Sequence, residues 1–160
     1  MEVDGAIINS IENDHLEILK ILWPHFKTSP ITFPLRTKEL LIDNEDTDLL
    51  KWLYENITDF GEMIPISYFF KSIEKGNLSM AKLIFEHIPK PNTIEISKTL
   101  YFAPFTSDIL CQNHYEILEW IFETFKDELT KEKVIVYKQV LESNYPNSIE
   151  SIEIINKYLK

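Results

Sequence analysis

Four histidines and one cysteine are the side chains that could do chemistry in this 160-residue sequence. His15 and His114 each stand two residues before a glutamate, a spacing that could offer a metal ion two ligands from one turn. A zinc site needs a closed set of three or four ligands, and the sequence has neither an HExxH motif nor a second cysteine. We therefore interpret the histidines as structural or helix-capping residues, and we expect no metal ion and no cofactor.

Cys111 lies three residues before His114, which could act as the base that converts the thiol into a nucleophilic thiolate. This pair leaves open a small all-α enzyme, either a hydrolase or a transferase. The alternative is a small side chain packed between helices, a common use of a free cysteine. The sequence contains no GxSxG motif, phosphate-binding loop, glycine-rich nucleotide turn or kinase motif. We favour a protein that is not an enzyme.

The sequence is acidic, with 26 acidic and 16 basic residues and a net charge of −10. The excess is largest in residues 1–63, which contain thirteen acidic and five basic residues and include the acidic segment Asp43–Asp48. Such a charge argues against binding to nucleic acid, which requires clustered Lys and Arg. Three interpretations stay open: a surface that steers a basic protein partner, an acidic decoy that mimics nucleic acid, and a solvated face that maintains solubility.

The compartment is predicted from the N-terminus and the cysteine count. The sequence begins MEVDGAII, with acidic residues where a secretory signal would be positively charged, and Cys111 has no second cysteine for an internal disulfide. No stretch has the composition of a transmembrane segment. We expect an intracellular protein, cytoplasmic or nuclear, that does not bind membranes. The sequence leaves the oligomeric state open, and we favour a monomer.

An eight-residue pattern recurs through the chain and predicts its architecture. The third, fourth, seventh and eighth positions are apolar in every copy, and the eighth is aromatic in all but the last. In the first four copies another apolar residue follows three positions later, which gives the i, i+3, i+4, i+7 spacing of one helix face. The copies begin at Leu16, Thr47, Leu78, Tyr115 and Ile152.

A second apolar segment precedes each copy and predicts a partner helix, although Val134–Val136 could also begin a strand. Polar turns such as Asn44–Asp46 and Lys75–Asn77 separate the two segments, and prolines mark the connections that follow the first three copies. The unit is helix, turn, helix and loop, and stacked units would bury one continuous core. We expect a single domain over residues 1–160, with units at about 1–31, 32–62, 63–95, 96–130 and 131–160.

The segments Asp14–Leu22, Gly76–Ile84 and Asn113–Ile121 resemble the turn and second helix of ankyrin repeats. The resemblance covers most of the chain, whereas the Thr-Pro-Leu-His signature of the family's first helix is absent. It implies an all-α, ankyrin-like solenoid of about five stacked helix-turn-helix repeats. Such a solenoid binds other proteins through its inner helices and loops, without a cofactor or a reaction of its own. A HEAT-like or other helical-pair solenoid is the alternative fold.

The family's pattern also predicts which residues would contact a partner. They are the variable positions before each turn and the residues one helical turn earlier. The charge of the acidic turn and the three aromatic residues of the loop Tyr101–Phe105 indicate two further candidate contacts, although these aromatic side chains could instead cover the core. The predicted contact residues are Glu12, Asn13, Glu39, Asp43, Asn44, Glu45, Asp46, Lys71, Glu74, Lys75, Tyr101, Phe102, Cys111 and Gln112.

Overall fold

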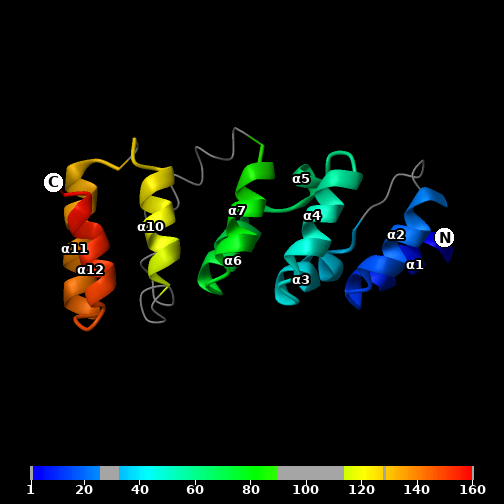
Figure 1. The fold of residues 1–160 in the computed structure, drawn as a ribbon, viewed down its shortest axis with the longest axis horizontal. Coiled ribbons are helices and arrows are strands. Elements are labelled where there is room, and N and C mark those ends of the chain that lie inside the picture. The colour runs from blue at the N-terminus through cyan, green and yellow to red at the C-terminus, as the bar shows by residue number, and fades with distance from the viewer. Residues whose placement is uncertain (1, 26–32, 90–113, 128, 160) are drawn as a thin grey trace.

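Helices form every element in the part of the chain that the computed structural model describes, residues 2–25, 33–89, 114–127 and 129–159. Figure 1 shows them following one another in a single row, with the N-terminus at one end and the C-terminus at the other. The predicted all-α class is therefore confirmed. The first helices of the pairs are α1 (Glu2–Glu12), α3 (Leu35–Asp43), α6 (Ile66–Glu74) and α11 (Lys131–Asn144). The second helices are α2 (Leu16–Leu22), α4 (Thr47–Asn56), α7 (Leu78–His87), α10 (Tyr115–Thr124) and α12 (Ile149–Lys157).

The turns between paired helices reverse the chain through one residue with left-handed backbone. This residue stands two positions before the second helix and is Asp14 (φ 59°), Glu45 (φ 59°) or Gly76 (φ 77°). Glycine adopts this conformation without steric cost, and Asp tolerates it better than Glu because its short side chain can hydrogen-bond locally. The predicted turns are thus confirmed in these three pairs.

Two of the second helices begin with a side-chain cap, which satisfies backbone amides that have no partner inside a helix. Asp46 Oδ1 accepts hydrogen bonds from the backbone amides of Asp48 at 2.8 Å and Leu49 at 3.0 Å. Asn77 Oδ1 accepts one from the Met80 amide at 2.9 Å. Asp46, predicted as a partner contact, therefore has a structural role at the start of α4.

Prolines set several helix boundaries. Pro34 and Pro65 stand immediately before α3 and α6, with φ of −56° and −61°. Pro24 has no amide hydrogen, so α2 ends at Leu22 and the chain continues as a short 3-10 helix, η1 (Trp23–His25). A further short helix, α5 (Phe60–Met63), lies in the connection that follows α4.

The apolar columns of the repeated pattern form the core. The fourth-position residue is completely buried in all five copies, and burying each such Leu or Ile contributes roughly 1.5–3 kcal/mol. The last apolar position is also buried where it is described, at Ile57, Ile88 and Phe125. The fourth-position residues are Leu19, Leu50, Ala81, Leu118 and Ile155.

The helix α10 belongs to two clusters of buried residues. Its Ile117, Ile121 and Phe125 pack with the core of α1 to α7, whereas Leu118 and Phe122 pack with α11 and α12. One face of this helix therefore contacts the preceding units and the adjacent face contacts the following unit. The first copy of the pattern departs from the expected burial, because its third residue, Ile18, is 48% exposed.

The helix predictions are confirmed where the chain is described, with two differences in detail. The second helices begin at residues 16, 47, 78 and 115 as the pattern indicates, but α12 begins at Ile149, three residues before the fifth copy. Tyr145 precedes a proline, which disfavours helical backbone, so α11 ends at Asn144 and the chain turns early. Val134–Val136 is part of α11 and not a strand. The predicted partner helix at 105–110 lies outside the described residues.

None of the helices in the described residues is both long and apolar enough to cross a membrane.

Candidate functional site

The turns between paired helices lie along the same edge of the row, which is the lower edge in Figure 1. We call this edge, formed by the turns Asn13–His15, Asn44–Asp46 and Lys75–Asn77 and by His114 at the start of α10, the turn edge. Most of the predicted contact residues lie on it or one helical turn before it. Three contacts connect its successive turns.

The first contact joins two carboxyl groups, those of Asp14 and Asp46. The hydrogen bond between them, burial and the neighbouring charge raise the pKa of Asp14 to about 6. Burial alone would raise the pKa of Asp46, but the hydrogen bonds from Asp14 and from two backbone amides outweigh burial and lower it. One proton is therefore held between the two turns, on Asp14, at mildly acidic pH.

The second contact joins opposite charges. Asp43 Oδ1, at the end of α3, lies 2.8 Å from Lys71 Nζ and 3.1 Å from Lys75 Nζ. Lys75 Nζ also lies 3.6 Å from Glu45 Oε1 and donates to the Asp43 carbonyl oxygen at 3.4 Å. Hydrogen bonds from the two lysines lower the pKa of Asp43. The structure thus brings four predicted contact residues together as one ion-pair network.

This network changes the interpretation of the acidic turn. Asp43 and Glu45 are paired with lysines of the next unit, so their charges are partly neutralised within the chain. Tyr68 is buried beside them, and burial, followed by the charges of Glu39 and Asp43, raises the pKa of its hydroxyl. Glu39 therefore lies close to the network while its own side chain is exposed.

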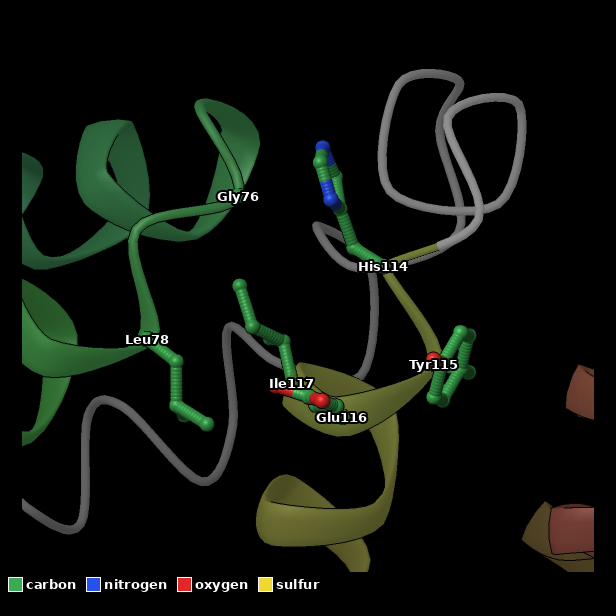
Figure 2. A pocket seen from close by; sticks show the side chains of 6 residues that line it. All are labelled: Gly76, Leu78, His114, Tyr115, Glu116 and Ile117. Carbon is green, nitrogen blue, oxygen red and sulfur yellow. The ribbon is translucent and has the colours of Figure 1, made fainter.

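The third contact is a close approach between a glycine and a histidine ring. His114 lies against Gly76, as Figure 2 shows, so closely that a Cβ added to Gly76 would overlap the imidazole ring. Gly76, Leu78, His114 and Ile117 line part of a cavity of about 130 Å³ beside this contact. Ile117 points into the space between the two turns in Figure 2. Glycine at position 76 adopts the left-handed backbone without steric cost, and its lack of a Cβ allows this close approach.

Other predicted residues are placed as follows. Glu12 Oε1 accepts a hydrogen bond from the hydroxyl of the buried Thr37 at 2.8 Å, which ties α1 to α3. The side-chain amide of Asn13 donates a hydrogen bond to the Asn9 carbonyl oxygen at 2.8 Å. Asn44 and Glu74 are exposed on the turn edge. The remaining predicted contacts, Tyr101, Phe102, Cys111 and Gln112, lie outside the described residues.

The sequence reasoning did not select Asp14, Thr37 or Gly76 as site residues. The repeat alignment contained a signal for two of them, because Asp14 and Gly76 occupy the position of Glu45, two residues before a second helix. Nothing in the sequence pairs Thr37 with Glu12, which lies twenty-five positions away. The alignment therefore identified the turns but not the contacts between them.

The histidines differ from the capping role that the sequence suggested. His15 and His114 stand at the N-cap positions of α2 and α10, but their side chains make no capping hydrogen bond. His87 stacks on Tyr54 with ring centroids 4.1 Å apart, and its Nδ1 lies 2.9 Å from the Leu83 carbonyl oxygen. Within the described ranges, no three His, Cys, Asp or Glu side chains are arranged to hold a metal ion. The Cys111–His114 chemistry stays a prediction because Cys111 is not described.

The chain matches no protein-family model, no curated protein and no solved structure.

Proposed function

We propose that the chain is an ankyrin-like repeat solenoid that acts as a non-enzymatic protein-interaction module. The row of helix pairs, the spacing of its second helices and the buried columns support this architecture. The observation that carries the functional proposal is the turn edge, where contacts between successive turns join separate units into one surface. An extended surface of this kind suits a protein partner more than a small molecule.

The partner would meet the exposed acidic side chains near the ion-pair network. Glu39 and Glu74 are exposed on the first helices α3 and α6, the two helices that Asp43 and Lys71 join by an ion pair. Because Asp43 already binds two lysines, Glu39 and Glu74 are the better candidates to attract a basic partner surface. The functional contact set would then be a mixed-charge surface with acidic residues beside it.

The test is capture of partners by the full chain as immobilised bait, from a lysate of cells that express it, at low and at moderate salt. We expect a protein that binds the parent chain but not the Glu39→Lys/Glu74→Lys variant. The matched control is Glu55→Lys/Glu86→Lys, which makes the same charge change at exposed positions of the second helices α4 and α7. If both double variants retain the same proteins as the parent, the turn edge is not the binding surface.

Salt dependence separates this proposal from the acidic decoy. A decoy that acts through its total charge would lose its partner steeply with salt and would respond equally to both double variants. A binding surface on the turn edge would lose its partner only in the Glu39→Lys/Glu74→Lys variant. Circular dichroism melting curves of all variants would show whether a loss of binding reflects unfolding.

A further inference from the structure

The repeated pattern assigns each position of a second helix to one neighbour. In α10, the third and seventh positions, Ile117 and Ile121, join the core of the preceding units. The fourth and eighth positions, Leu118 and Phe122, join the core of the following unit. Two sides of the same helix therefore contact two different units.

Aromatic pairs show the same rule between other units. Trp23, at the eighth position of the first copy, lies 5.7 Å from Trp52, at the sixth position of the second, in an edge-to-face arrangement. Phe85 and Trp120 repeat this pair between the third and fourth copies, also at 5.7 Å. The eighth position of one unit thus packs against the sixth position of the next.

In the first unit, the side of α2 that carries the third and sixth positions of the pattern is exposed. Its third and sixth positions are Ile18 and Ile21, which are 48% and 71% exposed. The equivalent third-position residues Leu49, Met80 and Ile117 are each 1% exposed. Ile18 and Ile21 therefore form an apolar side that, in later units, packs on the unit before it.

The last unit exposes the complementary side. Ile152 on α12 and Leu159 just after it occupy the first and eighth positions of the pattern, and both are half-buried against the core of the last unit. Ile149, one helical turn before Ile152, is 62% exposed. Helical geometry places Ile149 and Ile152 on one side of α12, and the equivalent first-position residue Leu78 lines the cavity beside His114 of the next unit.

We propose that the two ends bind each other between copies of this chain. Ile18 and Ile21 of one molecule would pack head to tail on Ile149, Ile152 and Leu159 of a second molecule. This contact would continue the packing that is already present between units. This contact joins different surfaces of the two copies, so it can extend beyond a dimer. The proposal is independent of partner binding at the turn edge.

Charge gives this association a salt dependence of its own. Each molecule carries a net charge of −10, so two molecules repel each other at low salt. Added salt screens this repulsion and is expected to strengthen the head-to-tail contact, whereas it would weaken binding of a basic partner. The salt concentration therefore distinguishes head-to-tail association from binding of a basic partner.

The first experiment is sedimentation velocity of the full chain over a series of protein concentrations, at low and moderate salt. We expect the sedimentation coefficient to rise with concentration, more strongly at moderate salt, and Ile21→Lys to abolish this rise. Because Ile21 is 71% exposed, this variant is expected to fold. Leu35→Lys makes the same type of change at a position that is 64% exposed and away from both ends, and it should associate like the parent. A parent chain that is monomeric under all conditions would overturn the proposal.

Disulfide crosslinking tests the orientation. In a Cys111→Ser background, Ile21→Cys and Leu159→Cys are prepared as separate proteins and oxidised together. The head-to-tail contact predicts that the mixed dimer dominates, because these positions correspond to the Trp52 and Trp23 pair. When the Leu35→Cys protein takes the place of the Leu159→Cys protein in the mixture, the mixed dimer should not form. A dominant dimer of the Ile21→Cys protein with itself would indicate symmetric pairing and would overturn the head-to-tail assignment.

Discussion

The first two contacts along the turn edge connect equivalent turns with opposite electrostatics. Between units one and two, Asp14 and Asp46 share a proton, and the pKa of Asp14 rises to about 6. Between units two and three, Asp43 binds Lys71 and Lys75, and its pKa falls. Contacts between successive turns can therefore be stabilised by a protonated or by an ionised carboxyl group, depending on what the next turn supplies.

This difference gives the two contacts opposite responses to pH. A raised pKa in the folded state means that the Asp14 contact is fully stabilising below the ordinary value of 3.8 and is lost as pH rises through about 6. A lowered pKa means that the Asp43 contact is fully stabilising above its ordinary value of 3.8 and is lost as pH falls through the lower folded value. Neutral pH favours the second contact, and mildly acidic pH favours the first.

The largest expected effect is at the third contact, between Gly76 and His114. Gly76→Ala adds a methyl group at a residue with φ of 77° and in the space of the His114 ring. Left-handed backbone alone costs a non-glycine residue about 1–2 kcal/mol. We therefore expect the free energy of unfolding, measured by urea denaturation, to fall by at least that amount.

Gly5 provides the matched control for this substitution. It lies in α1, and a Cβ added there would meet no atom within 4 Å. Gly5→Ala should therefore stabilise the protein by up to about 1 kcal/mol, because alanine is the better helix former. If Gly76→Ala leaves stability unchanged, then the turn at Gly76 is not as close to His114 as the structure indicates.

The next effect concerns the shared proton. The shift of Asp14 corresponds in full to about 3 kcal/mol, and solvent screening at this exposed residue reduces the expectation to about 1 kcal/mol. Asp14→Asn supplies an N–H donor to Asp46 at every pH. We expect this variant to be more stable than the parent by about 1 kcal/mol at pH 7 and about equal to it at pH 4.

Urea denaturation at a series of pH values checks this prediction. Asp59→Asn is the control, because Asp59 also has left-handed backbone, with φ of 60°. The control should keep the pH dependence of the parent, whereas Asp14→Asn should remove the loss of stability between pH 4 and 7. Identical pH profiles for parent and Asp14→Asn would show that the two carboxyl groups do not share a proton.

A smaller effect is expected at the ion-pair network. Asp43→Asn removes the charge that binds Lys71 and Lys75, and exposed pairs contribute only about 0–1 kcal/mol each. We expect a loss of about 0.5–1 kcal/mol at pH 7, which becomes smaller at high salt and below the ordinary pKa of Asp. Glu39→Gln, on the same helix and exposed, should cost less. Equal losses in both variants would mean that the network has no specific stabilising role.

The helices and the core could be predicted from the sequence because they depend on local periodicity. The pattern identified the fourth-position column, from Leu19 to Ile155, and every member is completely buried. It also placed the starts of α2, α4, α7 and α10 correctly. In these elements each residue's environment follows from its own neighbours in sequence and from stacking of similar units.

The contacts of the turn edge could not be predicted in the same way, because they depend on the distance and angle between units. The sequence shows Asp43 as one acid in an acidic turn, and only the structure places Lys71 and Lys75 beside it. It likewise shows Asp14 and Asp46 as separate turn residues. A repeat period fixes which residues are equivalent, but not which side chains of adjacent units meet.

The smallest predicted effect distinguishes backbone strain from charge within the second contact. Glu45 has left-handed backbone, with φ of 59°, and its carboxylate lies 3.6 Å from Lys75. Glu45→Gly removes the strain, loses this long ion pair and increases the entropy of the unfolded chain, so we expect a gain of only a few tenths of a kcal/mol. Glu45→Ala removes the ion pair and keeps the strain, so it should be less stable than Glu45→Gly by urea denaturation. If the alanine variant is as stable as the glycine variant, the turn is not strained at residue 45, and the equivalent turns differ only in the charges they present.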